Sequence, residues 1–366
     1  MSAPDLLYSD VEEELRSAVR AVLADRSPPA RVLARTETDE PYDPKLWRTL
    51  ATELGVAGLA VPESYGGAGA SLREAAVVCE ELGRGVAPVP FLGSAVVATA
   101  ALLAAGGSAV AVELLGELAA GTRTAALAVP FPTAPDARVP LATVDSGRLT
   151  GTVDAVADAL PADVLLVPAA DGLYAVDAAA ATRTPIISLD QTRQLCVIAL
   201  DGVPARLVTP DGAAVTAGLR AGAGLLASEQ VGVAQWCLES TVDYGKTRYQ
   251  FARPVGSFQA VKHRLADVWV ALTQARAVAR YAADCLAKSD VDTAVAVAVA
   301  QAHCGPTAVT AAEECVQLHG GIGFTWEHPA HLYLKRAKAD AIGFGTADRH
   351  RATLARLVDL PAGESS

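Results

Sequence analysis

Two segments in the C-terminal third carry residue types that could hold a phosphorylated cofactor. They run from Arg248 to Gln259 and from Gln317 to Phe324. An arginine presents a planar fork that matches a pyrophosphate, and a helix N-terminus expected at Ser257 would add free backbone amides. Glycines after a long helix either form a plain C-cap or let a dinucleotide approach the backbone. Taken together and in this order, the two segments predict half of a dinucleotide site.

Two other patterns resemble functional motifs but are better explained otherwise. Gly245-Lys246-Thr247 resembles the end of a P-loop, but Ser240 stands where that motif needs a glycine. The histidines 319, 328 and 331, with Glu327, could suggest a metal site. Pro329 between two of them indicates a helix start instead, so we expect no metal.

The N-terminal third is predicted to be helical. Ser71 precedes an apolar run from Leu72 to Leu82, and Glu74 stands at the position that completes a capping box. Other helices are expected over residues 11–23, 46–54, 95–105 and 109–119.

The middle of the chain has a different pattern, with more proline and glycine between short β-rich runs. No helical stretch there is long enough for a βαβ unit, so a Rossmann domain is not expected. The runs predict a small β-barrel or sandwich. They cover residues 125–129, 149–153, 164–167, 173–176, 185–189 and 195–200.

Long helices return after residue 213, with apolar spacing near 3.6 residues over 218–249, 258–287 and 291–318. Helices of this length joined by short turns predict an antiparallel four-helix bundle. The fold class is therefore α+β and multidomain. We expect an all-α domain over 1–120, a β domain over 121–212 and a helical bundle over 213–366.

Charge and cysteine usage restrict the partners and the compartment. The net charge of −11 argues against a nucleic-acid partner, which requires clustered Lys and Arg. Residues 1–10 lack the apolar core of a signal peptide, and the longest mostly apolar stretch, 95–105, is too short to span a bilayer. The six cysteines form no Cys-x-x-Cys motif. We expect a cytoplasmic protein with reduced thiols and no membrane association.

Nearly the whole chain resembles the acyl-CoA dehydrogenases, flavoproteins built from helices, a β domain and a four-helix bundle. The resemblance implies FAD as cofactor, acyl-CoA as substrate, and an electron-transferring flavoprotein as electron acceptor. It rests on the two C-terminal segments and on Trp47, residues 59–69 and residues 80–84 of the N-terminal third. It implies that the following residues contact FAD, the first six of them across a subunit interface: Arg248, Phe251, Gln259, Gln317, Gly320, Gly321, Gly345 and Thr346.

The chain departs from this family where catalysis would occur. Desaturation needs a base to remove the acyl α-proton while hydride leaves for the flavin. The usual glutamate directly before the Gly-Thr pair is replaced by Phe344, and the alternative position on the first bundle helix is Gly222. The middle domain lacks the Thr-Glu-Pro segment and the tryptophan that line the flavin ring in typical members. No catalytic residue is therefore assigned.

This pattern resembles the non-catalytic partner in heteromeric α2β2 acyl-CoA dehydrogenases that act on steroid side-chain thioesters. The leading hypothesis is a subunit that completes the FAD site of a catalytic partner. One alternative is a self-sufficient homomer with a displaced base, for which Asp340, Asp348 and Glu229 are candidates. Another is an assembly protein that has lost flavin.

Overall fold

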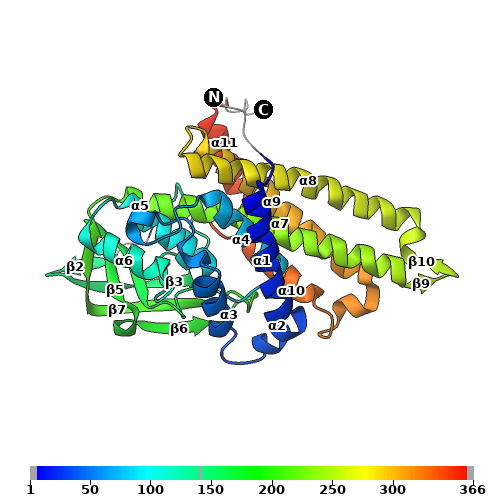
Figure 1. Ribbon diagram of the computed structural model, residues 1–366, viewed down its shortest axis with the longest axis horizontal. Helices are drawn as coiled ribbons and strands as arrows, with labels where there is room; N and C mark the ends of the chain where they lie inside the picture. Colours follow the sequence, from blue (N-terminus) through cyan, green and yellow to red (C-terminus); the bar gives the residue numbers. More distant parts are fainter. Residues whose placement is uncertain (1–5, 140–141, 361–366) are drawn as a thin grey trace, which may run out of the picture.

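The computed structural model describes residues 6–139 and 142–360. The segment 1–10, in which we expect no signal peptide, is described only in part, because residues 1–5 lie outside the described residues. The β domain lies toward one end of the long axis and the hairpin β9–β10 at the other (Figure 1). The N-terminal third is helical, as predicted, with these elements: α1 (Asp10–Arg26), α2 (Pro29–Thr36), α3 (Pro44–Arg48), η1 (Thr49–Glu53), η2 (Val56–Gly58), η3 (Glu63–Tyr65), α4 (Leu72–Arg84), η4 (Phe91–Ala98), α5 (Thr99–Ala104) and α6 (Ala109–Ala119).

The capping box predicted at the start of α4 is confirmed. The Ser71 hydroxyl accepts from the Arg73 amide at 3.1 Å, and the Glu74 carboxylate accepts from the Ser71 amide at 2.8 Å. The apolar run 95–105 forms α5 together with the second half of η4, a π-helical stretch that begins earlier than expected, at Phe91.

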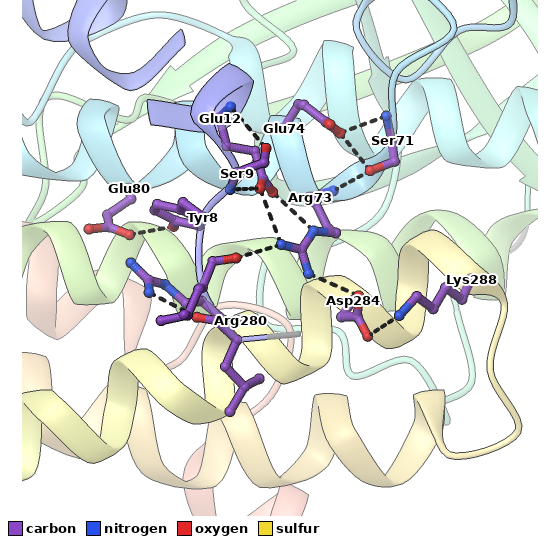
Figure 2. Close-up of polar contacts among 12 residues, drawn as sticks. Tyr8, Ser9, Glu12, Ser71, Arg73, Glu74, Glu80, Arg280, Asp284 and Lys288 are labelled. Atoms are coloured by element: carbon purple, nitrogen blue, oxygen red, sulfur yellow. Dashed lines mark hydrogen bonds and ion pairs between the residues drawn. The ribbon is translucent and has the colours of Figure 1, made fainter. Parts of the chain in front are cut away.

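Both the N-terminal helices and the segment that precedes α1 contact helix α8 (Gln259–Lys288) of the C-terminal bundle (Figure 2). Arg73 of α4 donates to Glu12 of α1 at 3.0 Å and to Asp284 of α8 at 2.9 Å. The guanidinium of Arg280 lies 3.7 Å from the centre of the Tyr8 ring. These contacts fix the N-terminal domain against the C-terminal bundle.

The middle domain is a sandwich of two four-stranded sheets, ordered β1-β4-β5-β8 and β2-β3-β7-β6. The barrel option was wrong: the described strands pair into two separate sheets and do not close. The run 185–189 was also misplaced, because β6 ends at Ile186; β2 and β8 were not anticipated. The strands are β1 (Ala125–Leu127), β2 (Thr143–Asp145), β3 (Arg148–Ala157), β4 (Val164–Ala169), β5 (Gly172–Asp177), β6 (Thr182–Ile186), β7 (Leu195–Pro204) and β8 (Arg206–Thr209), with the 3₁₀ turn η5 (Ala178–Ala180) after β5.

Strand β4 is apolar throughout because both faces of its sheet are covered. Leu166 packs in the main helical core, whereas Leu165 and Val167 pack against Leu149 and Ile198 of the second sheet. A strand buried on both sides shows no alternation of apolar and polar residues. The sheet thereby joins the β domain to the helices.

The C-terminal domain is built on α7 (Ala213–Thr247), α8 and α9 (Thr293–His319), and is completed by α10 (Ala330–Asp340) and α11 (Ala347–Leu357). The hairpin β9 (Tyr249–Gln250) and β10 (Arg253–Pro254), with the turn η6 (Val255–Ser257), connects α7 to α8; η7 (Gly320–Phe324) follows α9. Gly245-Lys246-Thr247 forms the last turn of α7 and does not follow a strand, unlike a P-loop.

Two glycines let α4 and α7 cross closely. A Cβ at Gly83 would overlap the backbone oxygen of Glu229, and one at Gly232 would overlap that of Glu80. The close crossing holds the middle of α7 against the N-terminal domain and fixes the position of Glu229 in the interior.

Among the described residues, one helical stretch, Thr293–Phe324, is long and apolar enough to cross a membrane. Of its most apolar part, 56% is buried inside the structure, and the core helix of a helical bundle meets the same criterion.

Candidate functional site

The first predicted motif lies at the end of the bundle remote from the β sandwich (Figure 1). Arg248 is the C-cap of α7, and its extended backbone turns the chain into the hairpin β9–β10. The side chain of Arg248 is exposed and has no partner among the described residues. Phe251, at φ +52°, projects its ring outward with 86% of the residue exposed.

The expectation for the next helix needs a correction. Helix α8 begins at Gln259 with Phe258 as N-cap, so Ser257 belongs to the preceding 3₁₀ turn and does not supply the helix N-terminus. The Ser257 hydroxyl donates to the Pro254 carbonyl at 2.6 Å, which stabilises that turn. Gln259 is exposed at the first position of the helix, where backbone amides have no intrahelical partner.

The second motif follows the end of α9. His319 is buried, and its Nδ1 lies 2.7 Å from the Cys315 carbonyl. Its ring packs against Tyr244 of α7 with 4.5 Å between ring centroids, which joins the two motif-bearing helix ends. Gly320 and Gly321 are exposed, and a Cβ built on either meets no atom within 4 Å.

This end of the bundle, which we call the distal tip (Arg248–Gln259 and Gln317–Phe324), can accept a planar, negatively charged molecule. An uncompensated guanidinium, an exposed ring and accessible glycine backbone are suited to a pyrophosphate with attached rings. These groups are the ones that the sequence predicts for the phosphate-bearing part of a dinucleotide. Their contact with FAD stays a prediction.

The second region lies between the β sandwich and the bundle, and there the two positions expected for a base meet. A Cβ on Gly222 of α7 would stand 2.6 Å from Cζ of Phe344 and 2.8 Å from Cγ2 of Val97. Phe344 is only 5% exposed. The phenyl ring therefore fills the space that a carboxylate at either position would need.

Phe131, from the loop after β1, closes the same space from the β domain. Its ring lies edge-on to Phe344 at 5.4 Å, and its carbonyl accepts from the Phe344 amide at 2.8 Å. Residue 343, which packs against the Phe131 ring, must be glycine, because an added Cβ would stand 2.5 Å from that ring. His350 Nε2 is 2.9 Å from the Phe344 carbonyl and holds a backbone that is at φ +53°.

A buried ion network lies behind the two rings and joins the β domain to the bundle. Arg193, from the loop between β6 and β7, donates to Glu229 of α7 at 2.7 Å and to Asp340 of α10 at 2.6 Å. Arg336 of α10 donates to Asp190 and to the same Glu229, both at 2.5 Å. The guanidinium of Arg193 also lies 5.3 Å from the centre of the Phe131 ring.

The network shifts the pKa values of two of its carboxyl groups in opposite directions. Burial by itself raises the pKa of Glu229, but Arg193 and Arg336 bring that pKa below its ordinary value. Burial, and then the charge of Glu229, raise the pKa of Asp340 well above its ordinary value. Two buried guanidinium groups, Arg193 and Arg336, thus share the three carboxyl groups of Asp190, Glu229 and Asp340.

The three candidates for a displaced base are therefore in different environments. Glu229 and Asp340 are both fully enclosed in the network, where Arg193 binds each of them. Asp348 is exposed on α11 and forms an ion pair with Arg351 at 2.7 Å. Within the described part of the chain, no hydrogen bond or ion pair joins any of the three to Phe344 or Gly222.

Gly345 and Thr346 follow Phe344 and begin α11. Gly345, at φ +107°, is buried, whereas the exposed Thr346 caps α11 by accepting from the Arg349 amide at 3.3 Å. Asp136, from the same loop as Phe131, binds Arg349 at 2.9 Å and also pairs with Arg356. The loop is thereby held against α11.

Sequence reasoning missed the residues that close this inner region: Phe131, Asp190, Arg193 and Arg336. The signals available were weak. Arg193 lies in the predicted β region and Arg336 in a short helix, and in both places the sequence pattern is typical of a surface arginine. At this junction the side chains present do not fit an isoalloxazine ring, because Phe131, Phe344 and the ion network fill it.

Comparison with known proteins identifies matching families and structures. The description "Acyl-CoA dehydrogenase, N-terminal domain" matches residues 9–122, and "Acyl-CoA dehydrogenase, C-terminal domain" matches residues 211–358. The chain is 39% identical to the acyl-CoA dehydrogenase IpdE2 of Mycolicibacterium smegmatis over 91% of this chain and 94% of that protein. It is also 39% identical to IpdE2 of Mycobacterium tuberculosis, over 89% and 91%.

Solved structures with the same fold include members of hetero-oligomers. A chain of the ChsE4-ChsE5 complex from Mycobacterium tuberculosis superposes with a TM-score of 0.88 at 27% identity, covering 98% of this chain and 100% of that one. A chain of the Tcur3481-Tcur3483 steroid ACAD gives a TM-score of 0.85 at 32% identity, covering 96% and 98%.

Proposed function

Because this chain belongs to the acyl-CoA dehydrogenase family of oxidoreductases, we propose that it is a cofactor-completing subunit without a catalytic base of its own. It assembles with an unlike, catalytic dehydrogenase subunit. The observation that carries the proposal is the filling of both base positions by one phenylalanine ring, at Phe344 beside Gly222.

The distal tip is the part of this chain that acts on the cofactor. Arg248 and Gln317 hold the pyrophosphate and adenosine end of an FAD whose ring belongs to the partner. Phe251 and the glycines 320 and 321 supply a ring face and accessible backbone. When bound, FAD accepts hydride from the acyl group. The partner subunit supplies the base and the wall of the ring pocket.

The substrate class follows from the same relatives. An acyl-CoA thioester derived from a steroid is the proposed substrate of the complex, since a steroid ACAD of two components has this fold at 32% identity. Electron-transferring flavoprotein is the proposed acceptor.

Co-expression tests the proposal. The full chain is produced alone and together with a dehydrogenase that carries the glutamate absent here. We expect a colourless chain alone, and a complex that is yellow and oxidises acyl-CoA. A homo-oligomer of this chain that purifies with FAD and desaturates an acyl-CoA would refute the proposal.

A pair of substitutions tests the role of the distal tip. Arg248→Ala removes a charge-assisted contact to phosphate, which is worth about 1.5–3 kcal/mol and corresponds to roughly 10- to 150-fold weaker FAD binding by the complex. The matched control is Lys246→Ala, since Lys246 lies on the last turn of the same helix and pairs with Asp243. Equal flavin absorbance in both variants would exclude Arg248 from the cofactor site.

A further inference from the structure

Two cavities flank Arg220, which lies on α7 between the N-terminal domain and the bundle. The first, of about 340 Å³, lies toward the β domain and includes Asp136 and Thr216 in its lining. The second, of about 490 Å³, lies toward α5 and includes Ala217. Arg220 lines both. Their volumes are within the range of about 300–1,000 Å³ that is typical of small-molecule sites.

Arg220 is half-buried, and no described residue forms a hydrogen bond or ion pair with its guanidinium. The two carboxylates that line the cavities have other roles. Asp136 binds Arg349 and Arg356. Asp290 caps its own turn by accepting from the Asp292 amide at 2.9 Å. A partly buried guanidinium without a counter-ion is unusual, because withdrawing a charge from water costs free energy unless the charge is paired.

The larger cavity supplies the rest of a binding site. Alongside Arg220, small and aliphatic side chains cover much of it, from Ala100 and Leu103 of α5, Ala217 of α7 and Leu286 of α8. These side chains offer an apolar space that ends at a positive charge. That combination matches a molecule with an aliphatic body and an anionic head.

We propose that the cavity between α5, α7 and the α8–α9 turn binds a medium-chain aliphatic carboxylate, with its carboxylate on Arg220 and its tail against Ala217 and Leu103. This site needs neither flavin nor a catalytic partner. Its ligand is bound as an intact anion, and no covalent step is involved.

Octanoate is a suitable probe for isothermal titration calorimetry on the full purified chain, with octanol and inorganic phosphate for comparison. We expect octanoate to bind, and octanol and phosphate to bind at least tenfold more weakly. Arg220→Gln should weaken octanoate by about tenfold or more, the effect of losing a hydrogen bond to a charged group. The control Arg148→Gln, at the exposed start of β3, should bind octanoate like the unsubstituted chain.

Neighbouring positions on α7 identify the cavity that holds the tail. Ala217→Phe fills the larger cavity and should abolish octanoate binding, whereas Thr216→Phe fills the smaller one and should leave it intact. Absence of octanoate binding, octanol or phosphate binding as tight as octanoate, or the reverse effect of the two phenylalanine substitutions would overturn the proposal. Because the readout is calorimetric and free of flavin, its failure would not bear on the cofactor-completing role.

Discussion

The contact between Gly222 and Phe344 makes a prediction about coupled stability. In Gly222→Ala the new methyl group would stand 2.6 Å from Cζ of Phe344, against about 3.5–4.0 Å for an unstrained carbon contact. Overpacking of this kind costs about 1–3 kcal/mol. Alanine in a helix gains about 0.8–1.0 kcal/mol over glycine. The single substitution should therefore destabilise the chain by roughly 0–2 kcal/mol.

Removing the ring should reverse the sign. Phe344→Ala alone costs about 3–5 kcal/mol, as for other buried phenylalanines. In that background the methyl group at Gly222 no longer meets a ring, and Val97 can move into the vacated space. Gly222→Ala should then stabilise the chain by up to about 1 kcal/mol, from helix propensity. The coupling free energy between the two positions is about 1–3 kcal/mol.

Thermal unfolding of the full chain measures the cycle, at roughly 2 °C for each kcal/mol in a chain of this size. Gly218→Ala is the matched control. Gly218 lies one turn earlier on α7, where a Cβ would approach the Val97 carbonyl and Ala101 but not Phe344. Its effect should be the same with and without Phe344→Ala. If Gly222→Ala is equally costly in both backgrounds, the ring does not fill the base position and the reasoning fails.

Three further outcomes are expected. Glu229→Gln removes the carboxylate that pairs with two buried guanidinium groups and should lower the free energy of unfolding by about 3–5 kcal/mol, measured by chemical denaturation. The control Glu113→Gln, in an exposed ion pair, should cause no measurable change. Burial and the charge of Glu229 raise the pKa of Asp340, so the stability that this group contributes is full below its ordinary pKa of 3.8 and is lost as pH rises through the folded-state pKa. Asp340→Asn should remove that pH-dependent loss, and an unchanged profile of melting temperature against pH would contradict this prediction. Burial raises the pKa of Asp136, but Arg349 and Arg356 lower it to about 2, so the ion pairs that hold the loop after β1 against α11 are lost only in strong acid. Asp136→Asn should therefore speed tryptic cleavage after Arg138 at neutral pH. Equal cleavage rates in the two proteins would contradict this prediction.

Much of the architecture was accessible from pattern alone. The capping box at Ser71 and Glu74 marks the start of α4 in the sequence, because its hydrogen bonds join residues only two or three apart. Long apolar periodicity predicted α7, α8 and α9 to within a few residues. Strand β6 was misplaced because Ile187 and Leu189 look like strand residues, yet Ile187 is fully exposed and the chain turns there to bring Asp190 inward.

The sequence by itself determined the long helices, most of the strands, the family and the absence of a carboxylate at residues 222 and 344. These depend on local spacing and residue type. Only the tertiary structure decided that these two positions face each other and that a ring from Phe131 closes the gap. It also decided that Arg193 and Arg336 are buried counter-ions. The reason is physical: such contacts join residues from 36 to more than 200 positions apart in the sequence. The cost of burying each charge is offset only by a partner that folding brings beside it.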